Sequence, residues 1–181
     1  MRAKVAFILG LVALLVAMPL AGCGEEEGEE ALESVEGEPL HLGELIYNVA
    51  ITRFLNPNDT SDQEYLVGQP PEPPGQSYLA VFLLITNDSD DEAFQVADDF
   101  TVTDASGRLY EPLESESPYA LELGATVEPD GAIPEPDTTA AEGPIQGAML
   151  LFLVDDDVSE ERPLELEIES TEGTGIVELD I

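Results

Sequence analysis

The chain is poor in basic residues, cysteine, histidine and tryptophan, and each shortage excludes a class of function. Its 181 residues include five Lys and Arg, one Cys, one His and no Trp, against 40 Asp and Glu. The formal charge of −35 argues against nucleic acid as a partner, because no basic surface is available to neutralise phosphates. One Cys excludes an internal disulfide framework and a Cys-rich zinc site. Because a glycine-rich phosphate loop is also absent, we expect no cofactor.

The segment 1–23 has the pattern of a secretory signal. Arg2 and Lys4 precede an uncharged stretch at 5–20, which is shorter than the ~20 residues that a membrane-spanning helix needs. The stretch ends in Leu-Ala-Gly-Cys at 20–23, which resembles the lipobox of bacterial lipoproteins at each of its four positions. The resemblance implies that residues 1–22 are removed as a signal peptide and that the Cys23 sulfur receives a diacylglyceryl group.

Lipidation of Cys23 predicts a protein anchored to the cell membrane on its extracytoplasmic side. Two or three acyl chains anchor a protein stably, whereas one binds only marginally. Cleavage removes two basic residues and leaves three Arg with all 40 acids, a formal charge of −37. Because anionic lipid repels such a surface, the acyl chains alone would hold the protein at the membrane. The alternative is a plain secretory signal, or a signal anchor in which the cysteine is incidental.

Residues 23–41 have the composition of a flexible acidic tether between the lipid and a folded domain. Residues 24–40 contain eight Glu, three Gly and no basic residue. Like charges in one block repel each other and keep a chain extended. A regulatory acidic tail is the alternative. We expect the folded domain to span residues 42–181.

The rest of the chain has the pattern of short β-strands separated by turns. Leu45, Tyr47, Val49 and Ile51 alternate with polar or small residues, as in a half-buried strand. Residues 77–87 are apolar at nearly every position, which predicts a central strand buried on both faces. Further strands are predicted at 93–96, in a hairpin formed by 100–104 and 108–110, and at 148–154, 164–168 and 177–181.

About seven short strands, split by Pro- and Gly-rich turns, predict an all-β fold: an immunoglobulin-like antiparallel β-sandwich. The order of features resembles the immunoglobulin-like domain of secreted bacterial proteins called DUF4352, which is related to the mycobacterial antigen MPT63. The matching pieces are the strand 78–87 with its final Thr-Asn, the hairpin 100–110 with Ser-Gly at its turn, and the late apolar strand 148–154. The resemblance implies a fold and an extracytoplasmic setting, and it supplies no catalytic residue.

The abundant acids raise two kinds of candidate site. A hydrolase site needs two carboxylates with different pKa values beside apolar walls, but the acid-rich stretches here lie in turns or on outward strand faces. Calcium takes six to eight oxygens. Loops 88–92 and 155–157 hold clustered acids, although neither matches a known calcium loop. We therefore expect a solvated acidic surface with loose divalent cation association, and a solvated His41.

Two long segments, 56–76 and 112–143, are predicted to carry any binding site. Long loops at the ends of a sandwich are often functional. Each segment contains several Pro and one tyrosine, Tyr65 or Tyr119, that could anchor a partner. The alternative is that both segments are mobile linkers.

We expect a lipid-anchored extracytoplasmic binding or interaction module without catalytic activity, whose protein or peptide partner the sequence does not identify. The alternatives are a cell-envelope hydrolase that uses an acidic pair, and a structural envelope lipoprotein with no small ligand. The spread of acids along the whole chain favours adaptation to high salt; a field that steers a cationic partner is the other explanation.

Overall fold

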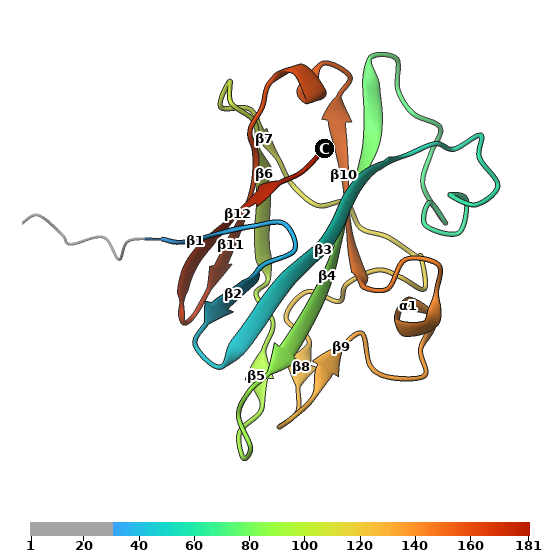
Figure 1. Ribbon diagram of the computed structural model, residues 1–181. Helices are drawn as coiled ribbons and strands as arrows, with labels where there is room; N and C mark the ends of the chain where they lie inside the picture. The colour runs from blue at the N-terminus through green and yellow to red at the C-terminus, as the bar shows by residue number, and fades with distance from the viewer. Residues whose placement is uncertain (1–30) are drawn as a thin grey trace, which may run out of the picture.

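The strand β4 (Gln76–Asn87) is the centre of the fold in the computed structural model, which describes residues 31–181 (Figure 1). As predicted, β4 is buried on both faces, and residues 78–83 are at most 1% exposed. Because apolar side chains project from both faces of this strand, each face must be covered by another layer of the protein. The strands around β4 form a sheet, here called sheet B, in the order β10-β4-β3-β2. Their bounds are β2 Pro39–Leu42, β3 Leu45–Leu55 and β10 Ala148–Asp155.

A second sheet, here called sheet A, packs against the inner face of sheet B and completes the sandwich. Its order is β1-β12-β11-β6-β7, with bounds β1 Leu32–Val35, β6 Asp99–Thr103, β7 Leu109–Tyr110, β11 Leu164–Ser170 and β12 Gly173–Leu179. The inner residues alternate with outer ones along each strand, as the period of two requires. Val81 and Leu83 of β4 meet Leu166 and Ile168 of β11 in one buried cluster. Burial of each such side chain stabilises the fold by about 1.5–3 kcal/mol.

The predicted tether is shorter than the sequence indicates, because β1 and β2 lie within residues 23–41. β1 pairs with β12 in parallel, and β2 pairs with β3 through the turn at Gly43. Leu40 and Leu42 are 3% and 2% exposed in the core, while His41 between them is exposed. Leu40 and Leu42 are the only alternating apolar pair of β2, and a pair this short does not identify a strand next to a Glu-rich stretch. The folded domain therefore begins near Leu32 and not at residue 42.

A β-bulge in β3 changes which of its side chains face the core. The register shifts between Val49 and Ile51, so Ile51 lies opposite Phe82 on the outer face and is 39% exposed. Thr52 takes the inward place opposite Val81 and is 5% exposed. An inserted residue reverses the alternation of every later position. The prediction that Ile51 continues the buried face of Leu45, Tyr47 and Val49 is therefore wrong.

The outer face of sheet B is covered by a third layer, made from the two long segments 56–76 and 112–143 and from Ile145, which follows the second. A second hydrophobic cluster joins Tyr78, Phe82 and Leu151 of the sheet to Tyr65 and Tyr119 of the two segments. The fold is thus the predicted all-β, immunoglobulin-like sandwich, with twelve strands among the described residues instead of about seven. The remaining elements are short: β5 Phe94–Gln95, β8 Thr126–Val127, β9 Ala132–Ile133, α1 Thr139–Glu142 and the 3-10 helix η1 Val158–Glu160.

Candidate functional site

An insertion in one strand of sheet B opens a groove on the surface. β9 and β10 both pair with β4 in the antiparallel sense, one after the other. Ile133 lies opposite Ile85, and Ala148 lies opposite Leu83. These two positions of β4 are only two residues apart, although Ile133 and Ala148 are separated by 14 residues of chain. β9 and β10 are therefore one broken strand. The chain between them, 134–147, leaves the sheet as an excursion that contains α1.

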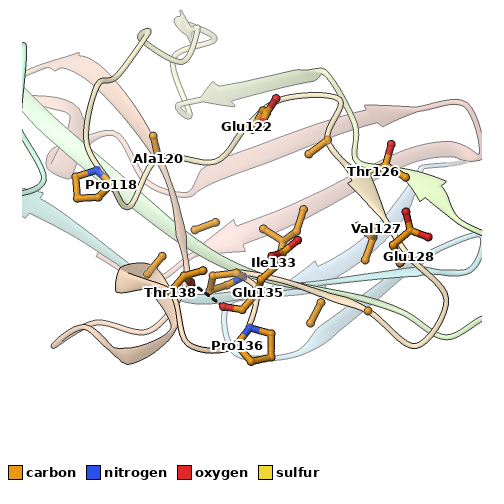
Figure 2. A pocket seen from close by; sticks show the side chains of 16 residues that line it. Pro118, Ala120, Glu122, Thr126, Val127, Glu128, Ile133, Glu135, Pro136 and Thr138 are labelled. Carbon is orange, nitrogen blue, oxygen red and sulfur yellow. Dashed lines mark hydrogen bonds between the residues drawn. The ribbon is translucent and has the colours of Figure 1, made fainter.

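The groove lies between this excursion and the segment 118–128, and it encloses a volume of about 610 Å³ (Figure 2). Its floor and walls are mostly small or apolar side chains. Three carboxylates line it, Glu122 and Glu128 from the segment 118–128 and Glu135 from the excursion, and all three residues are exposed. Figure 2 shows them spread around the groove and not gathered at one point. The lining residues are Pro118, Ala120, Glu122, Ala125, Thr126, Val127, Glu128, Gly131, Ala132, Ile133, Pro134, Glu135, Pro136, Thr138, Ala140 and Ala148.

The excursion is held in place by specific contacts on both sides of α1. The Thr138 hydroxyl caps α1, because it accepts a hydrogen bond from the Ala141 N–H at 3.3 Å and donates one to the Glu135 carbonyl at 2.7 Å. Gly143 lies directly against Tyr119. A Cβ at residue 143 would come within 2.6 Å of the Tyr119 Cε1 and 2.8 Å of the Thr139 carbonyl oxygen. Only glycine allows this close approach of ring and backbone.

The opposite wall of the groove is positioned by Asn87 at the end of β4. Its Nδ2 donates hydrogen bonds to the carbonyl oxygens of Glu92 at 2.7 Å, Val127 at 3.1 Å and Glu128 at 3.2 Å. Its side-chain oxygen accepts one from Ser89 N–H at 3.0 Å. This buried amide therefore fixes the turn after β8, and with it the backbone of Glu128.

The two tyrosines that the sequence suggests as anchors for a partner are core residues. Tyr65 and Tyr119 are each 2% exposed, and their ring centroids lie 4.5 Å apart. The Tyr119 hydroxyl donates a hydrogen bond to the Glu64 carboxylate at 3.1 Å. Tyr65 and Tyr119 are far apart in the sequence, so the residues around each of them do not indicate that the two rings pack together. The segment 112–143 does carry the groove, but through proline, alanine and glutamate and not through an exposed aromatic.

Two of the acids at 155–157, which the sequence suggests as candidate calcium ligands, instead bind a basic side chain, and Asp156 accepts a hydrogen bond from the Ser77 hydroxyl. Arg108 binds Asp104 at 2.7 Å, Asp155 at 3.0 Å and Asp157 at 2.8 Å, which joins the β6–β7 hairpin to the end of β10. Burial alone would raise the pKa of Asp104. Hydrogen bonds from Ser106 and Arg108 outweigh burial and hold that pKa well below its ordinary value. In this cluster the three carboxylates are bound to one guanidinium group.

The other acid-rich candidates remain on the solvated surface. In the loop 88–92, Ser89 is hydrogen-bonded to Asn87, Asp91 and Glu92, as turn residues usually are. Between residues 31 and 181, no three acidic, His or Cys side chains are grouped so that they could hold a metal ion.

A carboxyl group with a raised pKa occurs outside the groove. Burial raises the pKa of Glu167, and the negative charges of Glu169, Asp99 and Glu165 raise it further. Glu167 lies on β11 between Ile176 and Thr101, on the outer face of sheet A. It does not line the groove. Glu167 and the groove beside α1 therefore do not form one site.

The predicted lipidation site, Cys23, and the signal peptide 1–22 lie outside the described residues. Within the part of the chain that the structure does describe, no helix is long and apolar enough to cross a membrane.

Comparison with solved structures finds several similar proteins, one of them described as a β-sandwich. An uncharacterized β-sandwich protein from Clostridium difficile is 13% identical, with 86% of this chain and 99% of that one aligned at a TM-score of 0.52. The yjhA protein from Bacillus subtilis is 14% identical over 81% and 99% of the two chains, also at 0.52. The secreted protein MPT63 from Mycobacterium tuberculosis is 12% identical over 83% and 99%, at 0.49.

The first two likenesses show the fold alone, because identities of 13% and 14% are too low to carry a function across. No family model matches the chain, and no curated protein is significantly similar to it in sequence. Membership of the DUF4352 family therefore stays a prediction from the resemblance.

Proposed function

We propose that the protein is a lipid-anchored binding module on the extracytoplasmic side of a bacterial membrane, without catalytic activity, and that its ligand occupies the groove beside α1. The observation that carries the proposal is the excursion 134–147 between β9 and β10. It interrupts a core strand, it is held by the Thr138 cap and by Gly143, and it opens a hollow about 610 Å³ in volume. A hollow on a rigid frame loses little conformational entropy when a ligand binds.

The position of the groove relative to the start of the domain supports this function. The described chain begins next to β1, at one edge of sheet A and beside β2 of sheet B (Figure 1). The groove lies beside β10, at the opposite edge of sheet B. A lipid at Cys23 would leave only residues 24–31 before β1, which reach at most about 28 Å. The anchor would thus hold the domain close to the membrane while the groove stays accessible.

Photocrosslinking in cells tests the proposal at single positions. A photoreactive amino acid replaces Pro136 in the groove, Thr60 in the other long segment, or Glu160 in η1, and all three are exposed. We expect a discrete crosslinked partner from position 136 and none from position 160. If no position forms a discrete adduct, the binding function is wrong. If all three positions give the same adducts, the groove is not the site.

A further inference from the structure

The residues that line the groove limit which ligands it can hold. Its lining contains no Lys, Arg or aromatic side chain, and its polar side chains are three Glu and two Thr. An anion would find no positive side chain there. A sugar would find no aromatic face on which to stack. The lining therefore suits a ligand that is positively charged and partly apolar.

Basic side chains combine the two properties that the groove requires. Lys and Arg lay their aliphatic stems along apolar surface while their charged ends stay at its polar rim. Here the apolar surface includes Ala120, Val127 and Ile133. Because Glu122, Glu128 and Glu135 are spread around the groove, they offer several single positions for cations and not one shared metal site.

The protein itself supplies no good occupant for the groove. Residues 24–31, which precede β1, contain five Glu and no basic residue. A second copy carries the same large negative charge, so it is repelled. Two of the three Arg between residues 31 and 181 are already bound within the domain, Arg53 to Asp62 and Arg108 to its three Asp. Charge complementarity therefore points to a partner of opposite charge.

We propose that the groove binds a basic segment of another protein, with Lys or Arg side chains on the Ala, Pro and Val surface and their charged ends at Glu122, Glu128 and Glu135. This inference rests on the proposed binding function and adds the chemical class of the ligand. The acidity of the molecule as a whole then also serves to steer that partner to the groove, because long-range attraction raises the rate of association.

Three synthetic hexapeptides of alternating sequence test the inference on the purified full-length protein: Lys-Ala, Gln-Ala and Glu-Ala repeats. In 0.15 M salt we expect the Lys-Ala peptide alone to shift the backbone amide signals of residues 120–140 in NMR spectra. Substitution of Glu122, Glu128 and Glu135 by Gln should weaken its binding at least tenfold. Binding of the Gln-Ala peptide with equal affinity would overturn the inference, since charge would then not select the ligand.

A matched triple variant separates the groove from the general negative field. Glu33→Gln, Glu160→Gln and Glu178→Gln remove the same charge from β1, η1 and β12, where all three side chains are exposed. Exposed charges farther away than the Debye length of about 8 Å at this salt concentration contribute little, so we expect a change below twofold. Equal weakening by both triple variants, or amide shifts scattered over sheet A, would contradict a built site.

The outcomes also separate this inference from the proposed function. If position 136 crosslinks a discrete partner but the Lys-Ala peptide does not bind in the groove, the binding module stands and its basic ligand is wrong. If neither experiment gives a signal from the groove, both fail. Spermidine, which carries the same charge as the Lys-Ala peptide, serves as an additional probe. Tighter binding of spermidine than of the peptide would show that the apolar surface contributes nothing and would overturn that part of the inference.

Discussion

Replacement of Asp104 by Asn is expected to lower the stability of the fold strongly, although it removes only one of many negative charges. The Asp104 carboxylate is buried and accepts five hydrogen bonds, from Ser106 N and Oγ, Arg108 N and Nε, and the Tyr110 hydroxyl. In Asn one oxygen remains for the first three donors. The amide nitrogen then faces the Arg108 Nε–H and the Tyr110 hydroxyl, and the Arg108 Nε–H is left without an acceptor.

The size of the effect follows from the bonds lost. A hydrogen bond between charged groups contributes about 1.5–3 kcal/mol, and breaking a buried ion pair costs about 3–5 kcal/mol. Arg108 is one-third exposed and keeps its ion pairs with Asp155 and Asp157, so its charge is not left unpaired in the variant. We therefore expect a loss near the lower limit, about 3 kcal/mol. For a domain of this size that corresponds to a fall in Tm of roughly 6–12 °C.

The pH dependence of stability provides a second test of the same reasoning. Because folding lowers the pKa of Asp104, the unfolded chain binds its proton more readily than the folded one. The contribution is complete above the unfolded pKa, about 3.9, and is lost as the pH falls from about 5 toward the lower folded value. The variant should therefore show a flatter fall in stability below pH 5 than the unsubstituted protein.

Thermal and urea unfolding, followed by circular dichroism, measure both effects. The matched control is Asp98→Asn, an exposed residue with no side-chain hydrogen bond in the described structure. It should be neutral or slightly stabilising, since it relieves repulsion among the acids. Surface substitutions usually change the free energy of unfolding by no more than about 0.5 kcal/mol. If Asp104→Asn differs from the control by no more than this, or keeps the pH slope of the unsubstituted protein, the Arg108 cluster does not hold the fold as argued.

Four further predictions follow from individual contacts. Asn87→Asp should destabilise the domain by about 3 kcal/mol in urea unfolding and broaden the amide signals of the groove, because a carboxylate would face three carbonyl oxygens. Gly143→Ala should cost about 1–3 kcal/mol, because its Cβ overlaps the Tyr119 ring, and a Tyr119→Ala background should reduce that cost. Thr52→Val should raise stability by about 1 kcal/mol, because the buried Thr52 hydroxyl has no hydrogen-bond partner among the described residues. The Tm should rise between 0.05 and 2 M NaCl, and an unchanged Tm would count against adaptation to salt.

The parts of the fold that the sequence predicts well are those set by local pattern. The apolar run of β4 can be placed only at the centre of a sheet, and the β6–β7 hairpin follows from alternation on both sides of a turn at Gly107, whose φ is +84°. β11 alternates apolar and polar residues along its length, so its faces can be assigned without a structure. In β12 only the last residues, 177–179, show this alternation, and the strand begins four residues before the predicted start at Val177. In each case the pattern of a few neighbouring residues is enough to predict the strand.

The parts that the sequence does not predict depend on distant partners. Tyr65 gives no local sign that it packs on Tyr119, and β1 is recognisable only through its pairing with β12 at the other end of the chain. The groove does lie in a segment that the sequence singles out, because 112–143 is long and rich in proline. Its cause, a strand broken between β9 and β10, is visible only from the pairing of both pieces with β4.

The burial of β4 on both faces explains why the two long segments exist. A two-layer sandwich needs one apolar face per sheet, but sheet B has two, so its outer face requires a cover. Tyr65 and Tyr119 attach the covering segments to the sheet, and the second segment also bridges to β10 at Pro112–Phe152 and Ala120–Met149. The groove lies next to this cover, so deletion of residues 112–143 would expose Phe82 and Met149 and unfold the domain. Substitution of the exposed Glu122, Glu128 and Glu135 leaves the cover intact, and it is therefore the perturbation that separates function from folding.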